Sequence, residues 1–227
     1  MSTHTDSQKH SFPWFNLLVI ALGLGVISAF WVIGVSSLVS LSHSLPLTSS
    51  KAYWFISRSS GVLAYVLLTL GVMWGLVQSG GILRPTIPPL LALGLHSFLN
   101  WSSLAMAALH AIILLGDNFI KLTLGDIVIP FISPYRPLVV GLGVLAIYLM
   151  FLLALSFYVR RQLGQKTFRT LHYASYLTYL LVTWHSLGAS SDTRVLWPLY
   201  VLSIGSVGFL TMWRIANSRQ RATVHKS

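Results

Sequence analysis

The chain has 227 residues, of which 55% are hydrophobic and only 8% charged, and its formal net charge is +11. A soluble domain normally carries about 25% charged residues, so this composition excludes a soluble globular protein and predicts an integral membrane protein. The sequence has no cysteine, which excludes disulfides, iron–sulfur clusters, thiolate-bound haem and covalently attached c-type haem.

Six apolar runs of membrane-spanning length follow a polar start. Residues 1–11 are expected to be disordered and cytoplasmic, and this polar stretch is too long for a cleaved signal peptide. We predict an all-α polytopic bundle of six transmembrane helices over residues 12–213, followed by a basic, disordered cytoplasmic tail over 214–227. The predicted spans are Leu17–Leu41, Tyr53–Val77, Leu90–Leu115, Leu138–Tyr158, Thr170–Leu187 and Trp197–Trp213.

The connections between these runs carry the usual breaking residues. The turn Gln78–Pro89 is rich in glycine and proline, which ends one helix before the next begins. Gly116–Pro137 is the longest connection, and its apolar centre is expected to touch the membrane interface. Arg160–Arg169 is predicted to be a short basic loop.

The distribution of basic residues predicts the orientation. Lys and Arg residues are twice as frequent at one set of helix ends as at the other, so the positive-inside rule places both termini in the cytoplasm, in an inner (plasma) membrane. The basic residues of the inner ends are Lys9, Arg84, Arg160, Arg161, Lys166, Arg169, Arg214, Arg219, Arg221 and Lys226.

Histidines in the third and fifth spans are the most informative feature. The third span holds His96 and His110, and the fifth holds His172 and His185. Ionisable side chains within a bilayer are costly and usually functional, and neutral imidazole is a common axial ligand of haem iron. Separations of 14 and 13 residues correspond to rises of roughly 21 and 19.5 Å. Two parallel helices would therefore offer two histidine pairs at matching depths, as two stacked b-type haems require.

Two points stay open at this stage. Thirteen residues of an ideal helix leave an angular offset of about 140°, so His172 and His185 do not share one face. Either the fifth span is locally distorted, or the haems approach it from different sides. A membrane histidine can also serve only to hydrogen-bond a neighbouring helix, although four histidines at matched depths are harder to explain in that way.

The four-histidine pattern resembles the ferric reductase-like transmembrane domain family. This family includes ferric reductases, the membrane part of NADPH oxidases and MsrQ, the haem subunit of a bacterial methionine sulfoxide reductase system. The segment RTLHYASYLTYLLVTWHSLGASSDT looks like the family's fifth helix, and YWFISRSSGVLAYVLLTLG looks like its second. The resemblance covers about residues 50–213 and implies six helices with haems between the third and fifth.

The resemblance also implies roles for individual residues. His96 and His172 would bind an inner haem iron, and His110 and His185 an outer one. Arg58 matches an arginine that lies near the outer haem in the family, and an arginine pairs well with anionic propionates. Arg169, one turn before His172, could pair the inner propionates. The alternative for Arg58 is an interfacial arginine that extends to water, and the alternative for Arg169 is a basic residue that only sets the orientation. Three aromatic residues are further candidates for packing on porphyrin: Trp101, Tyr179 and Trp184.

These features predict a di-haem cytochrome b that carries electrons across the membrane as a subunit of a multi-component oxidoreductase. The sequence has no GxGxxG fingerprint and no polar stretch for a FAD or nicotinamide domain, so we expect a separate donor, either a flavoprotein, a quinol or another redox subunit. The acceptor outside would be ferric iron, oxygen or a periplasmic redox partner. A flavin or quinone bound within the membrane domain stays open and unplaced. The alternative function is a haem-free structural or transport subunit.

Overall fold

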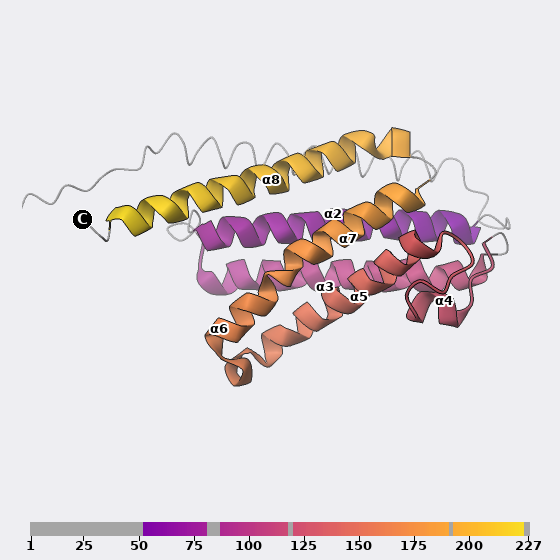
Figure 1. Ribbon diagram of the computed structural model, residues 1–227, viewed down its shortest axis with the longest axis horizontal. Helices are drawn as coiled ribbons and strands as arrows, with labels where there is room; N and C mark the ends of the chain where they lie inside the picture. Colours follow the sequence, from indigo (N-terminus) through magenta and orange to yellow (C-terminus); the bar gives the residue numbers. More distant parts are fainter. Residues whose placement is uncertain (1–51, 81–86, 118–119, 191–192, 225–227) are drawn as a thin grey trace, which may run out of the picture.

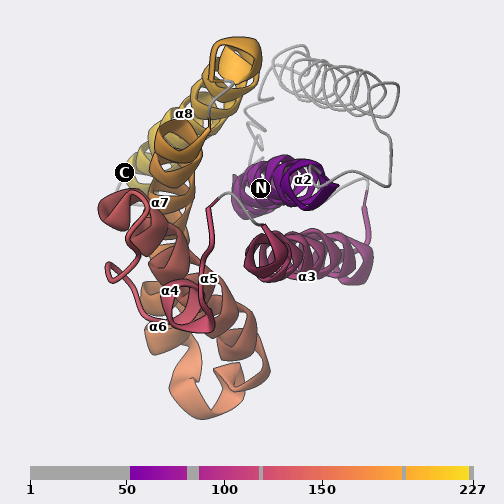
Figure 2. The ribbon, with the colours of Figure 1, turned by 90° about the vertical axis from the view of Figure 1, so that its right-hand side faces the viewer.

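A computed structural model describes residues 52–80, 87–117, 120–190 and 193–224. The described residues form α-helices and one 3₁₀ turn, and they contain no strand. The predicted first span, Leu17–Leu41, and the predicted disordered N-terminus lie outside this part of the chain. The helices form one elongated bundle, in which α2 and α3 lie side by side (Figures 1 and 2).

Four of the described helices are long and apolar enough to cross a membrane. Their candidate spans are Tyr53–Gly80, Pro89–Gly116, Pro137–Tyr158 and Arg194–Ser218. Large apolar side chains stay exposed on their outer faces, as on Leu90 and Met212, which are 79% and 72% exposed. Because lipid and not water is the natural contact of such a surface, the protein is embedded in a membrane.

Local sequence explains where these helices begin and end. Helix α2 (Ala52–Gly80) ends at the predicted turn, and α3 (Pro89–Ile113) begins with proline at its first position, where no intrahelical N–H is needed. A 3₁₀ turn, η1 (Leu114–Gly116), extends α3. Helix α5 (Pro137–Tyr158) also begins with proline. The long connection between α3 and α5 contains the short helix α4 (Leu124–Val128).

The predicted basic loop at Arg160–Arg169 is wrong for all of its residues except Gly164, because the residues on both sides of this glycine are helical. They belong to α6 (Arg160–His172), in which Gly164 has φ 75° and interrupts the helical backbone. Glycine adopts this left-handed conformation without a steric cost, so the helix resumes directly after it. Polar, basic residues suggested a loop, yet Arg, Lys and Gln are good helix formers wherever their side chains can reach water.

The predicted fifth span is divided between two helices. Its first residues end α6, and the remainder forms α7 (Ala174–Ala189). With 16 residues, α7 rises about 24 Å, which is less than the roughly 30 Å of a hydrocarbon core. Five of the six predicted spans lie in the described part of the chain. Four of these five form helices long and apolar enough to cross a membrane, and the predicted fifth span does not.

The last helix is longer than predicted. Helix α8 (Thr193–Val224) continues through residues 214–224, which we predicted to be a disordered tail. The correction has a simple cause: this segment contains Ala, Gln and Arg and lacks glycine and proline, so nothing in it ends the helix once the apolar part has formed.

The core is built mainly by α2 and α8, with fewer residues from α3, α5 and α7, and it contains hydroxyl groups among apolar side chains. Tyr65, Leu199 and Tyr200 are each at most 3% exposed. The hydroxyl of buried Thr69 donates to the Tyr65 carbonyl one turn back, at 2.8 Å, and Ser103 donates from α3 to the Ala64 carbonyl on α2, at 2.8 Å. Polar groups within lipid must find partners in the protein, and these do.

Asp126 in α4 gives a pH-dependent prediction outside the spans. The Thr123 hydroxyl and backbone N–H both donate to Asp126 Oδ2, at 2.7 Å. These bonds hold the pKa of the carboxyl below its usual range, because they stabilise its charged form. The stabilisation is complete above the unfolded pKa of about 3.9 and is lost as pH falls through the folded value.

We therefore expect α4 to open more often at pH 3 than at pH 6, measured as loss of hydrogen-exchange protection at the Ile129 amide after correction for the intrinsic rate. This amide donates to the Gly125 carbonyl at 2.8 Å and so reports on the helix. Asp126→Asn should show low protection at both pH values. Protection that falls equally in the wild type and this variant would contradict the explanation.

Candidate functional site

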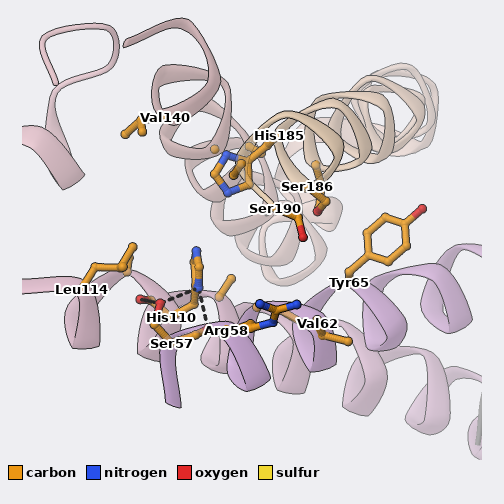
Figure 3. A pocket seen from close by; sticks show the side chains of 18 of the residues that line it. Ser57, Arg58, Val62, Tyr65, His110, Leu114, Val140, His185, Ser186 and Ser190 are labelled. Atoms are coloured by element: carbon orange, nitrogen blue, oxygen red, sulfur yellow. Dashed lines mark hydrogen bonds between the residues drawn. The ribbon is translucent and has the colours of Figure 1, made fainter. Parts of the chain in front are cut away.

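Two pairs of imidazole rings face each other across the bundle. The rings of His96 and His172 have centroids 6.1 Å apart, and those of His110 and His185 are also 6.1 Å apart. Figure 3 shows the second pair, with His110 and His185 pointing toward one another from opposite helices. The structure brings together the histidines that the sequence paired, and their role as haem ligands stays a prediction.

The two pairs lie at different depths along the bundle. His96 and His110 are 14 residues apart on α3, a rise of roughly 21 Å. Their partners come from α6 and α7, which are separated by a break immediately after His172. At this break the Tyr173 N–H contacts the carbonyls of both Arg169 and Thr170, and the Tyr176 N–H donates to the Tyr173 carbonyl at 3.1 Å. Such i to i−3 bonds tighten a helix, so the local distortion that the sequence left open is present.

Backbone carbonyls orient both rings of the His110–His185 pair, which we call the outer pair. His110 Nδ1 lies 2.7 Å from the Ser57 carbonyl oxygen, and His185 Nδ1 lies 2.8 Å from the Val139 carbonyl oxygen. A carbonyl can only accept, so Nδ1 carries the proton in each ring. The lone pair then lies on Nε2, which is the tautomer that binds a metal ion while Nδ1 is held by an outer partner.

Glycines on neighbouring helices make room for three of the four rings. A Cβ atom on Gly143 would lie 2.7 Å from His185 Nδ1, and one on Gly61 would lie 2.9 Å from His110 Nδ1. A Cβ atom on Gly75 would come within 3.1 Å of His96 Cε1. Ordinary van der Waals contact begins at about 3.4 Å, so any larger residue would displace the imidazoles.

The rings of the His96–His172 pair, which we call the inner pair, are contacted by different groups. The Asn100 amide, one turn later in α3, donates to the His96 carbonyl at 2.7 Å, and its nitrogen lies 3.4 Å from His96 Nδ1. Phe168, one turn earlier in α6, stacks on His172 with ring centroids 5.6 Å apart and an interplanar angle of 25°. Each ring of this pair is thus contacted by a side chain of its own helix.

Each histidine pair opens into its own cavity. The outer cavity has a volume of about 430 Å³ and is lined by His110, His185 and Tyr65, among others. The inner cavity has a volume of about 540 Å³ and is lined by His96 and His172. Both volumes lie within the range of small-molecule and cofactor sites. Leu68 and Met150 line both cavities, so the two spaces adjoin across this apolar pair.

Two arginines line each cavity. Arg58, which was predicted to lie near the outer site, lines the outer cavity and its guanidinium lies 4.9 Å from the centre of the Trp54 ring. Arg136 lines the same cavity and donates to the Gly188 carbonyl of α7. The predicted Arg169 lines the inner cavity together with Arg214, whose guanidinium is 3.4 Å from the Tyr176 hydroxyl. Both cavities are therefore suited to a ligand with anionic groups.

The aromatic candidates have different positions. Trp101 lines the inner cavity. Tyr179 is only 4% exposed and packs in the core, with its ring stacked on Tyr65 at 6.2 Å. Trp184 is 66% exposed and points outward, so its predicted contact with a cofactor between α3 and α7 is wrong. Helix periodicity could have shown this, because Trp184 directly precedes His185 and so lies about 100° around the helix from it.

Sequence reasoning missed the glycines, the two acceptor carbonyls, Arg136 and Arg214. Arg136 and Arg214 were counted only as topology charges. Glycines recur in the second and fourth predicted spans, and this recurrence was the one available signal, since glycine marks close approach in membrane helices. The carbonyls had no signal at all, because every residue has one.

The described residues contain no group of three His, Cys, Asp or Glu side chains that could hold a bare metal ion. Each pair instead offers two nitrogen ligands. Comparison of the chain with protein-family models, curated proteins and solved structures finds no match. The site is therefore interpreted from its own geometry.

Gly143 offers a direct test of how tightly the outer ring is held. We expect Gly143→Ala to destabilise the protein by about 1–3 kcal/mol, because the new methyl group overlaps His185. The measurement is the apparent melting temperature of the purified protein in detergent. Gly205→Ala is the matched control, since a Cβ atom there meets nothing within 4 Å.

A double variant identifies the cause. When His185 is already replaced by Ala, the added methyl group at position 143 should cost little. An equal cost in the presence and absence of the imidazole would show that the glycine serves another purpose.

Proposed function

We propose that the protein is a di-haem b-type cytochrome that transfers electrons across the membrane, as the membrane subunit of a multi-component oxidoreductase. The observation that carries this proposal is the repeated pair of facing imidazoles, each with a centroid separation of 6.1 Å and each at the wall of a cavity.

The spacing suits two imidazoles bound on opposite sides of one metal ion. A coordinating nitrogen lies about 2 Å from the metal and about 1 Å from the centre of its own ring, so two such rings have centroids about 6 Å apart. His96 with His172, and His110 with His185, would each hold one haem, because haem iron takes histidine nitrogens as its protein ligands. Pairs of histidines without a third protein ligand match this requirement.

When bound, haem supplies one-electron chemistry at its iron. The protein's own part is to hold, orient and insulate. The Ser57 and Val139 carbonyls keep Nε2 of His110 and His185 available as the ligand atom. Arg58 and Arg136 at the outer cavity, and Arg169 and Arg214 at the inner one, would neutralise propionate carboxylates.

The side chains that separate the two cavities would allow electrons to pass from one haem site to the other. Leu68 and Met150 are 4% and 8% exposed and carry no charged group. They keep the space between the sites apolar, and because they line both cavities the separation is only one layer of side chains. In the proposed orientation, with both termini in the cytoplasm of a bacterial-type inner membrane, electrons enter at the His96 side and leave at the His110 side.

The partners follow from this role. A separate flavoprotein, quinol or other redox subunit would supply the electrons. Ferric iron, oxygen or a periplasmic redox protein would accept them. The resemblance of the histidine pattern to the ferric reductase-like transmembrane domain family supports the same assignment.

Histidine substitutions test the pairing. We expect His110→Ala to lower the haem content from about two to about one per chain and to spare the inner site, because each pair holds its own haem. His96→Ala should spare the outer site. The measurement is the pyridine haemochrome of purified protein, with His225→Ala as a control outside both pairs. Folded protein that carries no haem in the wild type would contradict the proposed function.

Arg58 gives an independent electrostatic test. We expect Arg58→Gln to lower the midpoint potential of one haem by tens of millivolts, because loss of a nearby cation stabilises the oxidised iron. Redox titration followed in the visible spectrum measures this shift. The midpoint potential of the second haem should stay unchanged. An equal shift of both potentials would contradict the position of Arg58 beside one haem.

A further inference from the structure

A basic surface on α6 adjoins the inner histidine pair. The helix has the sequence RRQLGQKTFRTLH, with four Arg or Lys residues and no acidic residue. Arg160, Arg161, Lys166 and Arg169 are all exposed. The described acidic residues, Asp117 and Asp126, belong to the α4 region, which lies at the far end of the molecule from α6 (Figure 1). We call Arg160, Arg161 and Lys166 the α6 basic surface.

The direction of α6 places this surface beyond the lipid. Figure 1 shows the part of α6 that follows the Gly164 break continuing the line of α7, and not lying across the end of the bundle. Arg160 and Arg161 precede the break at Gly164, and the chain turns there at the same end of the bundle where α2 ends and α3 begins (Figure 1). The ends of spanning helices lie at the membrane surface and not in the hydrocarbon core. The first residues of α6 are thus presented to the aqueous phase, where a soluble partner can reach them.

The same helix leads directly to the inner site. His172 is its last residue, and Phe168 lies between the basic surface and His172, stacked on the imidazole. Phe168, Arg169 and Gln165 line the inner cavity. Lys166 is six residues from His172, a rise of roughly 9 Å. A partner bound to this surface would therefore sit close to the inner cavity.

We propose that the α6 basic surface is the docking site of an acidic, soluble electron-transfer protein that reduces the inner site. This proposal rests on the proposed function. One electron leaves the reduced cofactor of the partner and is accepted at the inner site, and no covalent bond is made or broken. Opposite charges would raise the rate of encounter and orient the partner with its cofactor toward Phe168 and His172.

The test uses the full-length, haem-loaded protein in nanodiscs of neutral phosphatidylcholine, which offer no anionic headgroup. Reduction of haem by a fully reduced acidic flavodoxin is followed by stopped-flow absorbance at increasing ionic strength. The variant carries Arg160→Glu, Arg161→Glu and Lys166→Glu, none of which replaces a residue that lines a cavity. Lys121→Glu with Arg194→Glu is the control, because it reverses exposed charges at the other end.

We expect the α6 variant to be reduced at least about tenfold more slowly than the wild type at low salt, and to lose most of the salt dependence. Reduction by a small neutral hydroquinone should be unchanged, which shows that the inner site itself is intact. The control variant should behave as the wild type with flavodoxin.

Three results would overturn the proposal. Haem-loaded α6 variant that flavodoxin reduces at the wild-type rate would remove the docking role alone. An unchanged rate together with lower thermal stability only in phosphatidylglycerol nanodiscs would assign these charges to lipid headgroups. Wild-type protein that folds without haem would overturn the proposed function and the docking role together.

Discussion

An imidazole N–H within a membrane needs a hydrogen-bond acceptor from the protein, and the packing of the helices in this bundle supplies it. At the outer site each Nδ1 is held by a backbone carbonyl of an adjacent helix, from Ser57 on α2 and Val139 on α5. Neither carbonyl belongs to the helix that carries the ring. The orientation of each histidine therefore depends on how its helix packs against a neighbour, which couples the site to the fold.

Helices α2 and α5 act as the supporting elements of the site. Helix α3 packs extensively on α2, and α7 packs extensively on α5, whereas α3 and α7 are not among the helix pairs with extensive contact. The imidazoles of each pair face each other, and the cavities open, between α3 on one side and α6 and α7 on the other. Glycines at positions 61, 75 and 143 let the supporting helices approach the rings closely. The cavities therefore stay open although the helices that line them are closely packed against α2 and α5.

The two ends of the bundle differ in their charged residues. Arginines line both cavities, so either one can hold an anionic group. At the inner end, the short helix α6 carries four basic residues and no acidic one, and it ends in His172. At the outer end the acidic residues Asp117 and Asp126 reduce the positive charge. A negatively charged soluble protein is thus favoured at one end of the bundle.

The sequence by itself determined the membrane environment, most of the helices and the pairing of the four histidines. These follow from local composition and from a fixed rise per residue, and both can be read along a single chain. It failed at residues 160–169 and 214–224, where polar composition suggested loop or disorder although the residues are good helix formers. It also could not resolve the offset between His172 and His185, which depends on the break at Tyr173.

The tertiary structure alone decided which carbonyls, glycines and arginines complete the site. A glycine makes room for a ring only when another helix brings that ring against it, and a carbonyl becomes an acceptor only when a donor is brought to it. Such contacts join residues that are distant in the chain, as Ser57 with His110 and Gly143 with His185. No periodicity records them, because they are properties of packing between helices and not of any one helix.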